Sequence, residues 1–303
     1  GRGMDLQFEV RDTRFHDIVD DKPLEVVATG FVFLEGPVWR PTDQAIIMSD
    51  IPASRMYIVH GTESAVYRDP SNKANGNAWD RSGRLVTCEH ATSRVTREEA
   101  DGTTTVLADR FEGKELNSPN DIIVALDATI YFTDPPFGRM NYFGIRRDRE
   151  LDFCGVYELP ADDSGLRLIA KDFAMPNGLC LSVDQQTLLV NDTERGHIRR
   201  FTRTADGLVE DPEVWATLTG EGDGRPDGMK IDRDGNVYCT GPGGIHVLSP
   251  QAESLGVIPI PEATANFAFG GDDLCTLYTC SSTTLFSLRV RVPGIDTIWP
   301  ISA

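Results

Sequence analysis

The sequence predicts an all-β fold: a six-bladed β-propeller with four antiparallel strands in each blade. Three observations predict it. Short β-rich segments alternate with Asp, Gly and Pro turns, helical periodicity is nearly absent, and one layout repeats six times along the chain. We therefore expect residues 1–303 to form a single propeller domain, with residues 1–23 as an N-terminal extension and residues 24–29 as a strand that closes the ring.

Each repeat consists of a small or polar anchor residue, an apolar run, a turn and a second apolar run. The spacing between successive anchors averages roughly 46 residues, the length that a four-stranded blade needs. The anchors are Glu35, Asn75, Asn120, Asn177, Asp227 and Asn266. Seven residues after each anchor comes a residue that favours turns, namely Thr42, Ser82, Asp127, Asp184, Asp234 or Asp273.

The outer strands of the blades follow from further apolar runs. In the third repeat they are predicted at 155–159 and 166–170, and in the fourth at 197–202 and 213–217. The last repeat has a strand at 284–288 but little sequence beyond it that reads as an outermost strand. We expect residues 24–29 to supply that strand, which would close the ring and leave no long unpaired edge.

Composition narrows the class of function. The chain carries 47 acidic against 29 basic residues, a net charge of −18, which argues against nucleic acid or an anionic membrane as partner. No segment reaches the length of an apolar membrane span, and the first residues do not resemble a signal peptide. The six cysteines have no paired spacing, so we expect buried free thiols and a cytoplasmic location. Nothing in the sequence indicates an oligomeric state.

The anchors predict a metal site. The innermost strand of each propeller blade begins near the central axis, so residues at one register converge there. Two carboxylates and four amides at that register are the oxygen donors that a hard divalent cation requires, and calcium is favoured. No anchor is His or Cys, which disfavours Zn²⁺, although Mg²⁺, Mn²⁺ and Zn²⁺ remain alternatives. The competing interpretation is that Asn or Asp before Gly simply forms turns, but Glu35 is no turn former.

Four of these segments resemble the metal-ligand motifs of the senescence-marker-protein/gluconolactonase/luciferin-regenerating-enzyme family. They are Glu35-Gly36-Pro37-Val38-Trp39, Ser118-Pro119-Asn120-Asp121, Met175-Pro176-Asn177-Gly178 and Pro226-Asp227-Gly228-Met229. The resemblance implies a six-bladed propeller, a calcium ion held by Glu35, Asn120, Asn177 and Asp227, and lactone hydrolysis. One position departs from the pattern: Ser118 stands where some lactonases of the family carry a substrate-binding Arg, which leaves the substrate open.

The leading hypothesis is therefore a calcium-dependent hydrolase that opens a lactone or related ester, a small-molecule substrate. Asp227 would take the proton from an attacking water, while Asn120 and Asn177 would contact the substrate oxygen. One alternative is a metal-dependent phosphotriesterase that uses the same ion. An alternative of another class is a non-catalytic calcium-binding propeller scaffold. No Gly-x-Ser-x-Gly sequence supports a covalent serine mechanism.

Four further residues are candidates for substrate binding: Asn75, Asn117, Asn266 and His90. His90 follows a predicted strand and could reach the channel mouth, but a satisfied structural histidine is the favoured interpretation. Asn117 either lines the pocket or holds its own loop. The proline-rich loop at 133–138 is either a preformed rim of the pocket or a plain rigid turn.

Overall fold

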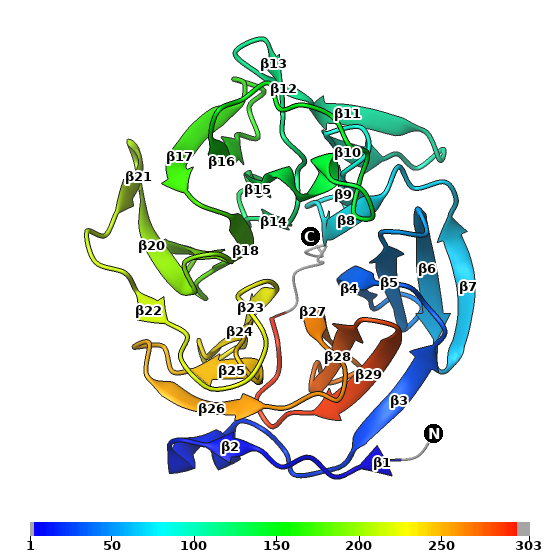
Figure 1. Cartoon of the computed structure of the whole chain (residues 1–303), viewed down its shortest axis with the longest axis vertical. Coiled ribbons are helices and arrows are strands. Elements are labelled where there is room, and N and C mark those ends of the chain that lie inside the picture. Colours follow the sequence, from blue (N-terminus) through cyan, green and yellow to red (C-terminus); the bar gives the residue numbers. More distant parts are fainter. Residues whose placement is uncertain (1–2, 296–303) are drawn as a thin grey trace.

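The computed structural model describes residues 3–295 and confirms the predicted six-bladed propeller, with the blades arranged around a central axis (Figure 1). Helical structure in this range is limited to two short 3-10 helices, η1 (Thr13–Asp17) and η2 (Pro136–Arg139). Among the described residues we find no helix with the length and apolar character needed to cross a lipid bilayer.

The first three blades are four-stranded antiparallel sheets, and the strands of each blade are named from the axis outward. Blade one contains β4 (Leu34–Arg40), β5 (Ala45–Asp50), β6 (Arg55–His60) and β7 (Glu63–Arg68). Blade two contains β8 (Ala74–Trp79), β9 (Leu85–Glu89), β10 (Arg94–Glu98) and β11 (Thr104–Ala108). Blade three contains β14 (Ile122–Val124), β15 (Ile130–Asp134), β16 (Cys154–Leu159) and β17 (Arg167–Phe173), and the hairpin β12 (Arg110–Phe111) and β13 (Lys114–Glu115) precedes it.

The last three blades carry extra edge strands. Blade four contains β18 (Pro176–Leu181), β19 (Thr187–Asp192), β20 (His197–Thr204), β21 (Gly207–Glu210) and β22 (Ala216–Thr217). Blade five contains β23 (Met229–Ile231), β24 (Val237–Gly241), β25 (Gly244–Leu248), β26 (Ser254–Ile258) and β2 (Glu9–Val10). Blade six contains β27 (Thr264–Gly270), β28 (Thr276–Ser281), β29 (Thr284–Arg289), β3 (Leu24–Thr29) and β1 (Gly3–Met4).

Ring closure follows the prediction. Strand β3 pairs antiparallel with β29, with Thr29 opposite Thr284 and Glu25 opposite Ser287. The segment before β3 also contributes to the sheets, because β1 pairs with β3 and β2 pairs with the outer strand of blade five. The first and last parts of the chain are thereby joined through hydrogen bonds in one sheet, which protects the edges of blades five and six.

The outer edge of blade four differs from the prediction. The sequence placed the outermost strand at 213–217, but most of the pairing to β20 comes from β21, which begins at Gly207 directly after a tight turn at residues 205–206. Only Ala216 and Thr217 pair with the beginning of β20, as β22. The prediction followed the apolar run that includes Val214 and Trp215. The turn before Gly207 was the better indicator of the outer strand, because a hairpin forms between the nearest compatible segments.

The hydrophobic core is distributed between neighbouring blades. Ile47 of blade one, for example, belongs to one buried cluster with Leu85 of blade two, and Phe132 of blade three belongs to one with Val86 of blade two. Inner strands such as β5 are buried along their full length, whereas the outer strand β7 is mostly exposed. The six cysteines are free and buried, as predicted. This arrangement leaves the axial ends of the innermost strands as the place where all six blades meet.

Candidate metal centre

All six anchors lie at the axial end of the innermost strands. Five of them are buried, with exposed fractions of 1–4%, and Asp227 is partly exposed. In four blades the pairing register shifts beside the anchor, between Glu35 and Val38, Ala74 and Asn77, Pro176 and Leu179, and Thr264 and Asn266. Such irregularities re-aim a side chain.

Neighbouring blades hold the anchor backbones in place. Four anchor carbonyl oxygens accept a hydrogen bond from the preceding blade: Ser49 Oγ donates to Asn75 (2.7 Å), Gly76 N to Asn120 (2.9 Å), Thr133 Oγ1 to Asn177 (2.8 Å) and Asn191 Nδ2 to Asp227 (2.8 Å). Because each of these carbonyl oxygens accepts a hydrogen bond from the preceding blade, the anchors form a ring whose spacing is set by blade packing.

This packing also explains the glycines that follow several anchors. Gly178 lies within β18 rather than in a turn, and a Cβ atom there would lie 2.0 Å from the carbonyl oxygen of Asp227. A Cβ at Gly36 would lie 1.9 Å from the carbonyl oxygen of Asn75. The turn interpretation is therefore wrong for Asn177-Gly178, where glycine permits close approach of two blades.

The two anchor carboxyl groups face each other. The carboxyl groups of Glu35 and Asp227 interact directly, and burial disfavours two negative charges at this place. Desolvation, and then the charge of Glu35, raises the pKa of Asp227 well above its ordinary value. Desolvation and the charge of Asp121 raise the pKa of Glu35. Glu35 Oε2 also accepts hydrogen bonds from Gly36 N (2.5 Å) and Asn266 Nδ2 (3.0 Å).

The orientation of the Asn177 amide is determined by its partner. Thr193 Oγ1 donates to the carbonyl oxygen of Pro226 (2.6 Å), so it can only accept from Asn177 Nδ2 (3.0 Å). The amide oxygen must then point away from Thr193. This buried Oδ1 has no hydrogen-bond partner among the described residues, and an unpaired buried acceptor of this kind calls for a ligand.

Asn75 is oriented in the same manner by His90. The Phe143 carbonyl oxygen lies 2.7 Å from His90 Nδ1, so Nδ1 carries the hydrogen. Desolvation lowers the pKa of His90 to about 4, so the ring is neutral and Nε2 accepts from Asn75 Nδ2 (3.1 Å). The buried Oδ1 of Asn75 is left without a partner within residues 3–295.

The oxygen donors of the anchors fit a hard cation that is bound partly by amide oxygens. In the part of the chain that the structure describes, no three Asp, Glu, His or Cys side chains are grouped to hold one ion. The ring instead offers the carboxyl groups of Glu35 and Asp227 and the amide oxygens of Asn75 and Asn177, which have no hydrogen-bond donor within residues 3–295. A divalent cation held by this ring would favour the ionised form of both carboxyl groups, and oxygen ligands of this mix suit calcium.

Two axial residues were missed by the sequence reasoning. Asp121 occupies the position after its anchor, where Gly follows the anchors of four other blades, and its carboxylate lies 3.4 Å from Asn266 Nδ2. Lys230 Nζ donates to Asn266 Oδ1 (2.8 Å), and its charge acts against the desolvation that raises the pKa of Asp121. The break in the anchor-Gly pattern at Asp121 was the available signal.

The remaining candidates are already engaged with protein. Asn117 Nδ2 donates to the carbonyl oxygens of Asp134 and Phe153, each at 2.9 Å, and its Oδ1 accepts from Arg149. Both amide atoms of Asn266 are also hydrogen-bonded. These contacts show Asn117 and Asn266 shaping the site, while their contact with substrate stays a prediction.

Comparison with known proteins shows which family the chain resembles in sequence and fold. The family described as SMP-30/Gluconolactonase/LRE-like region matches residues 33–283. A gluconolactonase from Zymomonas mobilis is 29% identical over 296 residues, covering 90% of this chain and 82% of the relative. A solved gluconolactonase from Xanthomonas campestris has a TM-score of 0.87 at 33% identity, covering 96% and 97% of the two chains. Regucalcin from Agrobacterium tumefaciens, a calcium-binding protein, shares the fold at 18% identity, with a TM-score of 0.74 over 90% of this chain and 95% of that chain. The chain belongs to the SMP-30/gluconolactonase/LRE-like family.

Proposed function

We propose that this protein is a calcium-dependent hydrolase that opens lactone rings at the axial ring of anchors. The observation that carries the proposal is the pair of interacting carboxyl groups, Glu35 and Asp227, in the same ring as the buried amide oxygen of Asn177, which has no hydrogen-bond partner among the described residues. Relatives named gluconolactonase and 6-deoxy-6-sulfogluconolactonase support the substrate class.

In this proposal Glu35, Asn120, Asn177 and Asp227 hold the ion. A divalent cation bound there would polarise the lactone carbonyl oxygen and, through its charge, favour ionised carboxylates. Glu35 is kept in position by Gly36 N and Asn266 Nδ2, and Asn177 by Thr193. The neighbouring blades thus supply a preorganised set of ligands.

Asp227 is the proposed general base. It is the most exposed anchor and its carbonyl is fixed by Asn191, so its carboxylate can meet a water that enters from the open side of the ring. In its ionised form it would take the proton from the attacking water as the water oxygen bonds to the lactone carbonyl carbon and the ring C–O bond breaks. The amides of Asn120 and Asn177 would orient the substrate oxygen, and Asn75 Oδ1 would accept from a substrate hydroxyl or water.

The test is an assay of ring opening with a panel of lactones. Activity should require calcium, disappear in chelator and return when calcium is added back. Asp227→Asn should lose at least a hundredfold in kcat, within the range of general-base contributions. The matched control is Asp101→Asn, which changes an exposed carboxylate in a turn of blade two.

Three outcomes would reject the proposal. Turnover that is insensitive to chelator would show that the reaction does not need the metal. Full turnover by Asp227→Asn would show that Asp227 is not the general base. Calcium binding without turnover of any lactone would favour a scaffold. For the location of the protein, the six buried free thiols support the cytoplasm, a reducing compartment.

A further inference from the structure

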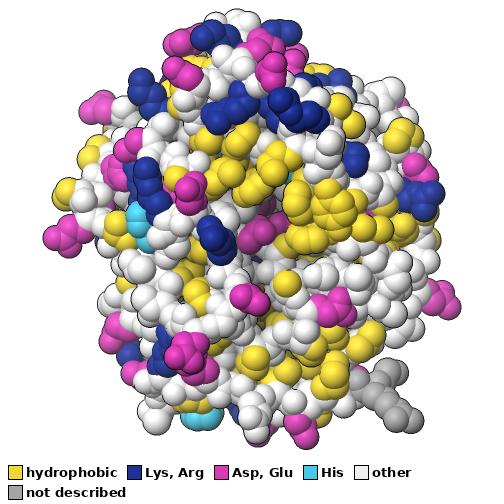
Figure 2. Space-filling model, viewed as in Figure 1, with side chains coloured by type: hydrophobic (Ala, Val, Ile, Leu, Met, Phe, Trp, Pro, Cys, Tyr) yellow, Lys and Arg dark blue, Asp and Glu magenta, His cyan; other side chains and the backbone are white. Residues whose placement is uncertain are grey.

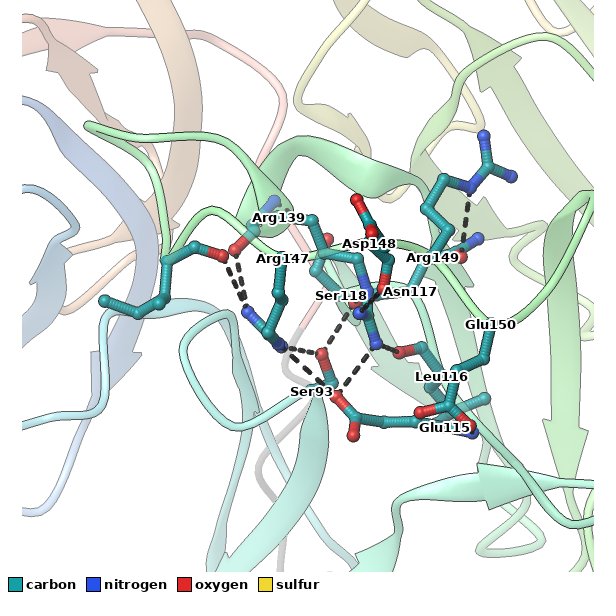
Figure 3. A network of polar contacts seen from close by, with 12 residues as sticks. Ser93, Glu115, Leu116, Asn117, Ser118, Arg139, Arg147, Asp148, Arg149 and Glu150 are labelled. Atoms are coloured by element: carbon teal, nitrogen blue, oxygen red, sulfur yellow. Dashed lines mark hydrogen bonds and ion pairs between the residues drawn. The ribbon is translucent and has the colours of Figure 1, made fainter.

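The loop between β15 and β16 borders the ring of anchors and is held firmly by arginines. Arg139 is buried and donates to the carbonyl oxygens of Leu116 (2.7 Å) and Asn117 (2.8 Å) (Figure 3). Arg147 donates to the carbonyl oxygen of His90 (3.2 Å) and pairs with Glu115 (3.4 Å). With its backbone tied to blade two and to the segment before Asn120, this loop has a defined shape before any ligand arrives.

The middle of this loop contacts two of the anchors' neighbours. The Phe143 carbonyl accepts the hydrogen bond from His90 that orients Asn75. The Phe143 ring packs edge-on against Phe33, with centroids 5.0 Å apart, two residues before Glu35. Phe143 therefore packs against the neighbours of Asn75 and Glu35, and this brings the middle of the loop near the ring of anchors.

Apolar side chains are exposed at this place. Val32, Met140, Tyr142 and Ile145 have exposed fractions of 44%, 50%, 51% and 49%. We call these four residues the apolar rim. Figure 2, viewed as Figure 1, shows hydrophobic side chains grouped beside acidic ones near the middle of the face that it draws. Tyr142 also has φ 82°, a conformation that is costly for an aromatic residue and is typical of ligand-contacting loops. Ordered apolar exposure beside a site indicates a ligand-contact surface.

Polar groups that could contact a sugar are occupied on this side of the site. Ser118 donates to the carbonyl oxygen of Pro135 (2.5 Å) and accepts from Gly138 N (2.8 Å), so its hydroxyl has no donor left for substrate. Lys73 Nζ donates to the carbonyl oxygens of Pro52 (3.3 Å) and Tyr142 (3.2 Å). Neither side chain replaces the Arg that some lactonases of the family use at the position of Ser118.

We infer that the substrate is a lactone with an apolar alkyl or aryl substituent, which lies on the apolar rim while the ring carbonyl faces the anchors. Such a lactone is preferred to a polyhydroxylated sugar lactone, because the rim offers apolar area and few free donors. This inference rests on the proposed lactone hydrolysis and narrows its substrate class.

The experiment compares kcat/KM for δ-gluconolactone and for δ-lactones whose alkyl side chain grows from none to four carbons. In the unaltered protein kcat/KM should rise roughly twofold to fourfold with each methylene that the rim covers. Tyr142→Asn, which tolerates a positive φ, and Met140→Ser should each reduce this factor toward one. Val209→Ser, at a residue 59% exposed on the outer strand β21, should leave the factor unchanged.

The outcomes separate the two proposals. If kcat/KM did not change with alkyl length while opening of the parent lactone remained sensitive to chelator, the proposed role of the apolar rim would be wrong and lactone hydrolysis would stand. The apolar rim would also be overturned if δ-gluconolactone exceeded every alkyl lactone, or if both rim variants kept the chain-length dependence of the control. Absence of turnover for all lactones in the presence of calcium would reject lactone hydrolysis itself, and the inference with it.

Discussion

Replacing Thr193 by Val should weaken calcium binding without touching any proposed ligand. The substitution keeps the shape of the side chain but removes the hydroxyl that accepts from Asn177 Nδ2 (3.0 Å) and donates to the Pro226 carbonyl oxygen (2.6 Å). The Asn177 amide would then lose the contact that keeps its oxygen turned away from Thr193. Loss of a group that orients a ligand typically costs tenfold to a hundredfold in metal affinity, which corresponds to about 1.4–2.7 kcal/mol.

Isothermal titration of calcium into chelator-stripped protein measures this effect. The matched control is Thr204→Val, which removes an exposed hydroxyl that donates to the Gly207 carbonyl oxygen (2.7 Å) in the turn between β20 and β21. The control should bind calcium like the unaltered protein. If Thr193→Val bound calcium within about twofold of the control, the reasoning about the Asn177 orientation would be refuted.

Three further predictions concern the fold around the ring. Gly178→Ala should destabilise the protein by about 1–3 kcal/mol or more in urea unfolding, because its Cβ would lie 2.0 Å from a carbonyl oxygen of the next blade. An unchanged urea midpoint would contradict the crowding argument. Lys230→Met should cost about 1–3 kcal/mol, since Asn266 Oδ1 loses a charged donor and keeps only the one from Phe267 N, and an unchanged urea midpoint would contradict this. The pKa of His90 is lowered to about 4, so the folded protein excludes a proton that the unfolded chain binds below pH 6.5. Between pH 6.5 and 4 it should therefore lose up to about 3 kcal/mol more stability than His90→Asn, and parallel pH profiles would argue against this.

Much of the architecture could be predicted from the sequence because each blade repeats the same local rules. Inner strands are apolar runs, turns carry Asp, and the anchors recur at one register. These patterns were enough to predict the number of blades and the closing strand β3. At three predicted turns the Asp side chain does accept the N–H two residues later, as at Asp127, Asp184 and Asp273. The outer edge of blade four was placed incorrectly because pairing partners were chosen by hydrophobicity and not by turn geometry.

The finer design of the ring could not be predicted from local patterns. The orientations of the Asn75 and Asn177 amides depend on a histidine, a threonine and two backbone carbonyls that lie on other segments. Asp121 was read only as part of a motif, since its contact with Asn266 spans 145 positions in the chain. Such contacts become visible only once the blades are assembled, because sequence periodicity reports burial and not side-chain direction.

The most direct test of the central claim is the calcium stoichiometry of chelator-stripped protein, measured by isothermal titration calorimetry. The unaltered chain should bind about one ion per chain, as a single set of converging oxygen ligands requires. The double variant Glu35→Gln, Asp227→Asn should remain folded and bind none, because it keeps the ring but removes both carboxylates. Equal binding by the two proteins, or no binding by the unaltered chain, would contradict a cation site on the axis.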